Sequence, residues 1–235
     1  MSARTPLRAL LLAALAATAL PAAASELAYT FIDFHVLDHD IGVTGSQSPV
    51  PEQDVTLSLG GGDGIAGSGA IAIRQFYLFG AFKSSIIDVT GTVTSPLATT
   101  PVSGNFDLVQ TSAGVGYQRE ISRNFDVIGE LSYEVADYDF GSFAGENFDM
   151  DESGVGVRLG FRWNPLPRYE IFAHAHHTPV GRPMLSALRI DSDTVIGGGL
   201  RWSFFEDLAL GLEHEAGKVK TTTLTLRFNF SNLPW

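Results

Sequence analysis

The stretch TTTLTLRFNF, residues 221–230, decides the fold because its side chains alternate in polarity without a break. The even positions from Leu224 to Phe230 are apolar, whereas the odd positions from Thr223 to Asn229 are polar or charged. Successive side chains of a β-strand point to opposite faces, so this segment predicts a strand with one apolar and one polar face.

The rest of the chain repeats this pattern, and short turns alternate with longer loops. The short turns are predicted at 74–75, 122–124, 164–168 and 205–207, and the main loops at 41–64 and 89–105. Such asymmetry is typical of outer-membrane barrels, with short periplasmic turns and longer outer loops. The predicted strands are 27–36, 65–73, 76–88, 106–120, 125–140, 151–163, 169–180, 190–204, 208–216 and 220–230.

These segments predict an all-β fold: a closed antiparallel up-and-down transmembrane β-barrel of about ten strands, with eight as the alternative. Closure requires the last strand to pair with the first, because an open edge in lipid leaves backbone N–H and C=O groups unpaired. A soluble β-sandwich or lipocalin-like barrel is the competing fold.

One face of each predicted strand carries no charged residue, and the opposite face collects the ions. An Arg or Lys facing the middle of a bilayer costs about 2–4 kcal/mol, so the ions are expected in the lumen as a structural ion-pair network. Such a network predicts a plugged or very narrow pore. Its members are Asp33, Arg74, Glu130, Glu134, Arg158, Arg162, Glu170, His174, His176, Arg201, Glu213, Glu215 and Arg227.

Aromatic residues gather where the apolar faces meet the short turns. Amphipathic rings favour the headgroup level of a membrane, so this pattern predicts an interfacial aromatic girdle and favours the membrane barrel over the soluble fold. The girdle residues are Phe76, Phe125, Trp163, Tyr169, Trp202, Phe204, Phe228 and Phe230.

Composition and the N-terminus agree with export. Arg4 and Arg8 precede an apolar run from Ala9 to Leu20 and a small-residue site near Ala24, so residues 1–24 are expected to be a signal peptide and 25–235 the barrel domain. The 235-residue chain has no cysteine and a net charge of −11, which argues against disulfides, thiolate chemistry and nucleic-acid binding.

The mature chain resembles the small outer-membrane β-barrels of the OmpA/OmpX-like superfamily of Gram-negative bacteria. The resemblance rests on the leader, the repeated entry after the short turns, which starts with an aromatic in three of four cases, as in Phe76-Tyr77-Leu78-Phe79-Gly80, and the aromatic-terminated last strand. It implies a location in the outer membrane, contact with lipid and lipopolysaccharide, and insertion by the barrel-assembly machinery.

Three clusters have residue types that could carry chemistry. His174 and His176 share a strand face and could chelate a metal, although pairing with lumen glutamates is the favoured interpretation. Asp33 and His35 resemble the carboxylate–histidine pairs of outer-membrane proteases. The acidic residues flanking loop 141–150 could hold calcium, but a solvated rim is favoured.

The sequence therefore predicts a monomeric, non-enzymatic barrel with a structural or surface-interaction role. No catalytic, cofactor-binding or metal-binding residues are assigned. A narrow small-solute channel and an outer-membrane hydrolase are the alternative functions.

Overall fold

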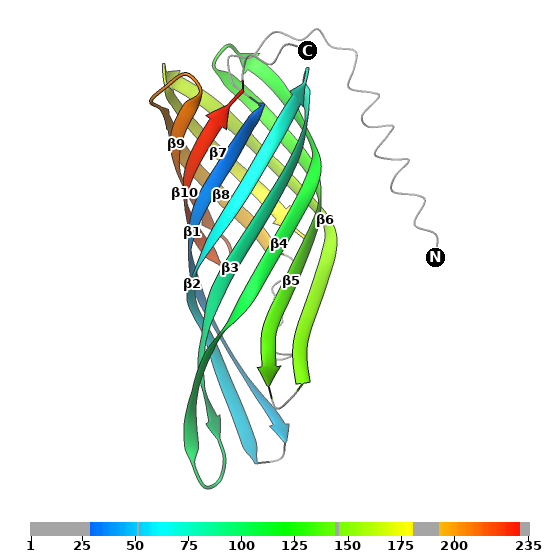
Figure 1. The fold of residues 1–235 in the computed structure, drawn as a ribbon, viewed down its shortest axis with the longest axis vertical. Helices are drawn as coiled ribbons and strands as arrows, with labels where there is room; N and C mark the ends of the chain where they lie inside the picture. Colours follow the sequence, from blue (N-terminus) through cyan, green and yellow to red (C-terminus); the bar gives the residue numbers. More distant parts are fainter. Residues whose placement is uncertain (1–28, 51, 144–145, 181–192, 231–235) are drawn as a thin grey trace, which may run out of the picture.

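The structure is a computed structural model that describes residues 29–50, 52–143, 146–180 and 193–230. Ten antiparallel strands form one closed barrel in which each strand pairs with its neighbours in sequence and β10 pairs with β1 (Figure 1). The predicted fold class and strand count are therefore confirmed. The predicted signal peptide, 1–24, lies outside the described residues.

The strands are β1 (Phe31–Val50), β2 (Gln53–Ile73), β3 (Phe76–Thr94), β4 (Thr99–Ser122), β5 (Phe125–Phe143), β6 (Glu146–Leu166), β7 (Tyr169–Thr178), β8 (Asp193–Ser203), β9 (Leu208–Ala216) and β10 (Lys220–Asn229). The β1–β10 ladder that closes the barrel runs without a shift from Phe31↔Asn229 to Asp40↔Lys220. No helix in the described part of the chain is long and apolar enough to cross a membrane.

The predicted loops at 41–64 and 89–105 are wrong, because these residues extend β1 to β4 well beyond the barrel (Figure 1). We call the two ends of the barrel the short-turn end and the hairpin end. Proline and glycine in these segments suggested breaks, yet Pro101 lies in β4 opposite Thr92 of β3. Among the described residues β5 pairs with β4 only from Asp107 onward, so Pro101 lies on an open edge, where a missing N–H is tolerated.

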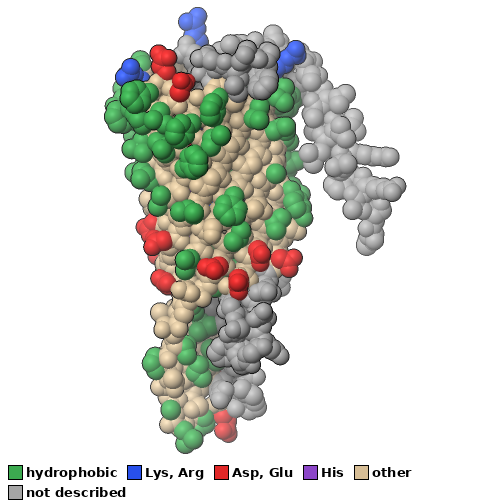
Figure 2. Space-filling view, in the orientation of Figure 1, with side chains coloured by type: hydrophobic (Ala, Val, Ile, Leu, Met, Phe, Trp, Pro, Cys, Tyr) green, Lys and Arg blue, Asp and Glu red, His purple; other side chains and the backbone are tan. Residues whose placement is uncertain are grey.

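The outer wall of the barrel is apolar. Large hydrophobic side chains point outward from every strand, and examples such as Ile65, Leu159 and Ile196 are more than 60% exposed. Figure 2 shows these side chains spread over the wall. A monomer in water rarely exposes such a continuous apolar surface, whereas a bilayer covers it.

Outward-facing aspartates mark where this apolar wall ends at the hairpin end. On β5 the apolar side runs from Phe125 to Val135 and is followed by exposed Asp137 and Asp139. This length matches the about 9–11 residues with which a tilted strand crosses the hydrocarbon. Figure 2 shows a row of acidic side chains at this level across the face in view. The exposed aspartates near this level on β1 to β6 are Asp38, Asp40, Asp63, Asp88, Asp107, Asp137, Asp139 and Asp151.

The polarity of the two faces reverses at this level. Ile87, Leu108 and Tyr138 face inward and are at most 3% exposed, while each has an exposed aspartate as a neighbour on the outer face: Asp88, Asp107 and Asp137. Apolar inside and charged outside is the arrangement of a barrel in water, since burial of apolar surface then drives packing. The strands thus pass from lipid into water at the aspartate level.

This boundary predicts opposite outcomes for lysine at two outward positions of β6. Leu159→Lys places a charge within the apolar wall and should lower the free energy of unfolding by about 2–4 kcal/mol. Asp151→Lys lies beyond the boundary and should change it by less than about 0.5 kcal/mol. Urea unfolding of the barrel in phospholipid vesicles measures both, and equal losses would contradict the boundary.

Candidate functional site in the lumen

The lumen is filled by large side chains that face glycines on neighbouring strands. A Cβ added at Gly116 of β4 would overlap the ring of Tyr77, and one at Gly156 of β6 would overlap the carboxylate of Glu134. Side chains just fill the interior of an eight-stranded barrel, and a barrel of ten strands is wider. Glycines therefore let a few long side chains reach across the lumen.

Aromatic and ionic groups block the short-turn end. Glu170 accepts hydrogen bonds from Arg162, at 2.5 Å, and from Arg201, and the carboxylate and both guanidinium groups are almost fully buried. The Arg162 guanidinium lies over the ring of Tyr29, 4.4 Å from its centroid, and Tyr29 donates a hydrogen bond to Asp126 at 3.0 Å. Buried charges are stable only when they are paired, so this cluster is rigid.

A second buried pair joins the two strands that close the barrel. Arg227 of β10 donates two hydrogen bonds to Asp33 of β1, from Nε at 2.7 Å and from Nη2 at 2.5 Å. The guanidinium also lies over the ring of Phe31, 3.5 Å from its centroid. Two parallel bonds of this kind fix the relative position of the two residues. We call this pair together with the Arg162–Glu170–Arg201 cluster the ionic layer.

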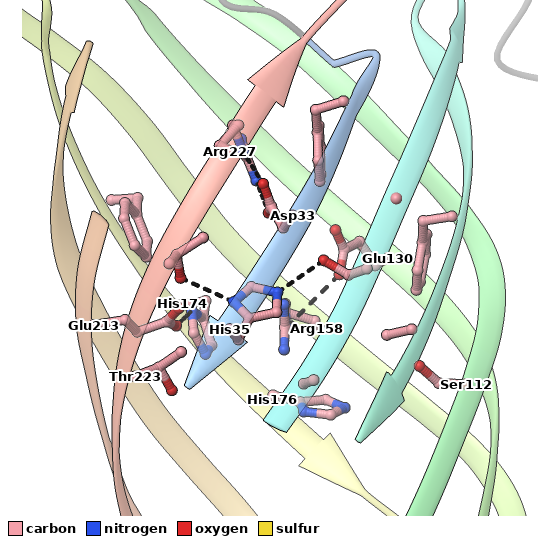
Figure 3. A pocket seen from close by; sticks show the side chains of 18 of the residues that line it. Asp33, His35, Ser112, Glu130, Arg158, His174, His176, Glu213, Thr223 and Arg227 are labelled. Carbon is pink, nitrogen blue, oxygen red and sulfur yellow. Dashed lines mark hydrogen bonds and ion pairs between the residues drawn. The ribbon is translucent and has the colours of Figure 1, made fainter. Parts of the chain in front are cut away.

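A cavity of about 310 Å³, lined by charged, polar and apolar side chains, lies next to the ionic layer (Figure 3). On one wall Glu130 accepts a hydrogen bond from the Tyr77 hydroxyl at 2.6 Å and lies 3.7 Å from Nε of Arg158. On another wall Glu134 contacts His176 Nε2 at 2.8 Å and also accepts hydrogen bonds from Ser132 and Thr178. We call this cavity the central chamber.

His174 and His35 also line the central chamber. His174 lies between two glutamates, with Nδ1 3.5 Å from Glu213 and Nε2 3.1 Å from Glu215. The ring nitrogens of His35 contact the hydroxyls of Thr225 and Ser68, at 2.9 and 3.1 Å. Figure 3 shows His174 beside Glu213 and the Arg227–Asp33 pair at the short-turn side of both.

An apolar cluster fills the lumen on the hairpin side of the chamber. Its members come from β1 to β5 and from the residues that follow β7 and precede β10, and each is less than 9% exposed. Inward side chains from several strands contact one another only across the lumen. The cluster therefore closes the lumen at this level. We call this set the apolar plug: Ile41, Leu59, Ile87, Phe106, Leu108, Ala136, Tyr138, Val180 and Val219.

The structure brings together twelve of the thirteen residues predicted for the lumen network, and Arg74 is the exception. Arg74 lies exposed in the β2–β3 turn, where its carbonyl accepts a hydrogen bond from Gln118. The other twelve line the central chamber or the ionic layer. The sequence interpretation missed the apolar plug, although continued alternation along β3 and β5 places Ile87 and Tyr138 inward.

The structure places the predicted aromatic girdle residues at the short-turn end of the outer wall. Trp163, Tyr169 and Trp202 are about two-fifths exposed and occupy neighbouring strands, with Tyr169 opposite Trp202 and Phe125 opposite Trp163. Trp202 also packs against Phe204, with ring centroids 5.7 Å apart. Phe76 and Phe125 are half-buried against Tyr117 and Phe161. Phe228 of β10 and Phe230, just after this strand, continue the row.

The geometry does not assemble a carboxylate–histidine pair from Asp33 and His35. Asp33 is held by Arg227, and His35 contacts two hydroxyl groups instead. Two residues of the predicted acidic rim, Asp137 of β5 and Asp151 of β6, are exposed and lie opposite one another at the aspartate level.

No protein-family model matches the chain, and a search of curated proteins gives no match. Among solved structures the chain is similar to the translocator domain of the autotransporter NalP from Neisseria meningitidis, at 15% identity and a TM-score of 0.48, over 95% of this chain and 94% of that one. It is also similar to the β domain of the Bordetella autotransporter BrkA and to Neisserial surface protein A. Both are 12% identical over 87% of this chain and 100% of theirs, with TM-scores of 0.46 and 0.42.

The closed barrel and its apolar wall define the class of protein on physical grounds. All ten strands pair around the ring, and the outward side chains between the aromatic girdle and the aspartates are mostly apolar and carry no charge. Only a closed barrel or a helix satisfies the backbone within lipid. The protein is a small transmembrane β-barrel.

The Asp33–Arg227 pair predicts a large difference between removing one partner and removing both. Asp33→Asn leaves the Arg227 charge buried without its counterion and should cost about 3–5 kcal/mol of unfolding free energy. Asp33→Leu combined with Arg227→Met removes both charges and should cost markedly less. Urea unfolding in vesicles gives both free energies of unfolding. A double variant that is less stable than Asp33→Asn would contradict this account of the pair.

Proposed function

We propose that this protein is a closed, non-conducting outer-membrane barrel with a structural or surface-interaction role. The observation that carries the proposal is the double block in the lumen, formed by the ionic layer near the short turns and the apolar plug near the hairpins. A solute crossing the barrel would have to break buried ion pairs and then displace packed apolar side chains.

The hairpin end supplies the surface for such a role. The β1–β2 and β3–β4 hairpins project beyond the aspartate level, and no charged residue occurs between Asp88 and Asp107. Every residue from Thr99 to Asn105 of β4 is exposed, and these residues form an open strand edge. Unpaired N–H and C=O groups of an exposed edge are able to pair with another chain.

The location follows from the same features. Short turns of outer-membrane barrels face the periplasm, so the projecting hairpins would lie outside the cell. Lipid would cover the apolar wall, and lipopolysaccharide would meet the aspartate level. Export through the periplasm, assembly by the barrel-assembly machinery and a monomeric state complete the proposal, since closure leaves no strand edge in the membrane that requires a second copy.

A narrow small-solute channel is the second candidate, and the central chamber favours it. The chamber shows that polar space exists inside the barrel, and charged side chains of both signs line it. The channel would require the ionic layer and the apolar plug to move. The Asp33–His35 pair considered for a hydrolase is not formed, because Asp33 bonds Arg227 and His35 contacts hydroxyl groups.

Planar-bilayer recording separates the closed barrel from the channel. The unchanged protein should show no steady conductance. A plug variant, Phe106→Gly with Tyr138→Gly, should remain closed because the ionic layer still blocks the lumen. A layer variant with Arg162, Glu170 and Arg201 all replaced by Ala should also remain closed. Only the two sets combined should conduct.

Gel migration before and after heating checks that each variant has formed a barrel. Large, steady conductance of the unchanged protein would contradict the closed barrel. A folded combined variant that does not conduct would show that the two layers are not the block.

A further inference from the structure

The central chamber has an excess of negative charge. Outside the ionic layer four carboxylates line it, those of Glu130, Glu134, Glu213 and Glu215, but only two permanently basic side chains, Lys83 and Arg158. With neutral histidines this part of the lining carries a net charge of −2. The members of the ionic layer that also line the cavity, Arg162, Arg201 and Arg227 with Asp33 and Glu170, carry a net charge of +1, so the whole lining carries −1. Charges removed from bulk water are costly unless they are paired or coordinate a metal, so a compensating positive group is required.

The excess is concentrated around His174. This residue is only 7% exposed and projects from β7, while Glu213 and Glu215 project from β9 on the same inner face. One ligand atom from each of the three side chains lies within 4.8 Å of the other two. Both carboxylates line the cavity and keep about a fifth of their side-chain surface exposed.

Strand β8, between β7 and β9, carries a glycine where the side chains of His174 and Glu215 come close together. Gly197 of β8 lies opposite both His174 and Glu215. A Cβ at Gly197 would lie 2.6 Å from Cε1 and 2.7 Å from Nε2 of His174, and 3.0 Å from Cγ of Glu215. Any larger residue at this position would push the imidazole and the carboxylate apart.

We propose that His174, Glu213 and Glu215 form a binding site for one divalent transition-metal ion, for which Zn²⁺ is the fitting probe. One imidazole nitrogen and two carboxylate oxygens are ligands that Zn²⁺ accepts, at about 2.0–2.2 Å, and the fourth position would face the cavity. The ion would place positive charge next to Glu213 and Glu215, on the negative side of the chamber. This site goes beyond the closed-barrel proposal and does not depend on it.

Protons offer the competing account of the same charge excess. Protonation of both His174 and His176 would add two positive charges, and both rings already lie beside carboxylates. The two accounts predict different contents of the chamber. The metal site requires a bound ion whose affinity depends on His174, Glu213 and Glu215, whereas protonated histidines require no ion.

Zinc binding by the tag-free barrel tests the proposal. The protein is refolded in detergent with ZnCl₂, so that access to the chamber is not limiting, and metal content and affinity are measured after gel filtration by mass spectrometry and chelator competition. The unchanged protein should retain one Zn²⁺ per chain. His174→Gln, and Glu213→Gln with Glu215→Gln, should each lower the affinity at least about tenfold.

His214→Gln is the matched control, since His214 lies between the two glutamates on β9 but is exposed on the outer face. It should bind zinc as the unchanged protein does, and MgCl₂ should not compete, because Mg²⁺ prefers six oxygen ligands. Heat-dependent gel migration confirms that each variant is folded. Absence of stoichiometric zinc, or equal binding by His174→Gln, would overturn the site and leave protonated histidines as the compensating charge.

Discussion

Backbone hydrogen bonding within lipid is the constraint on which the rest of this structure depends. Each unpaired N–H or C=O group in hydrocarbon costs several kcal/mol, so a sheet that enters a membrane must close on itself. The β1–β10 ladder provides the closure without a register shift along the membrane segment. Once closed, alternate side chains face either lipid or the lumen, and the lumen becomes the only place for ionised groups.

What fills the lumen then determines what the barrel is able to do. Near the short turns, buried arginines and carboxylates pair so closely that little space remains. Near the hairpins the strands have already left the lipid, and the interior packs like that of a soluble barrel. Between these two zones lies the central chamber, where charge is not balanced by fixed cations. The position of the membrane along the strands therefore explains both the plug and the chamber.

Residue alternation was sufficient to predict the strands, the closure and the assignment of charges to the lumen. It could not predict partners, because a pair such as Arg201 and Glu170 depends on the register between neighbouring strands. The projecting hairpins were missed because Pro101 and its glycine neighbours resemble loop residues, yet an open edge tolerates them. The apolar plug was missed because the strands leave the lipid near Ile87 and their inner face then becomes apolar. Alternation alone does not reveal where the surroundings of a strand change from lipid to water.

Depth measurements with spin labels along the outer face of β5 test the central claim most directly. The chain has no cysteine, so single substitutions at Val127, Leu131, Val135, Asp137 and Asp139 can each carry one label. The account predicts that labels at the first three positions collide more often with oxygen than with a water-soluble nickel complex, and that the order reverses at Asp137 and Asp139. Labels at Val127 and Leu131 that met water, or were held immobile in a dry protein core, would contradict it.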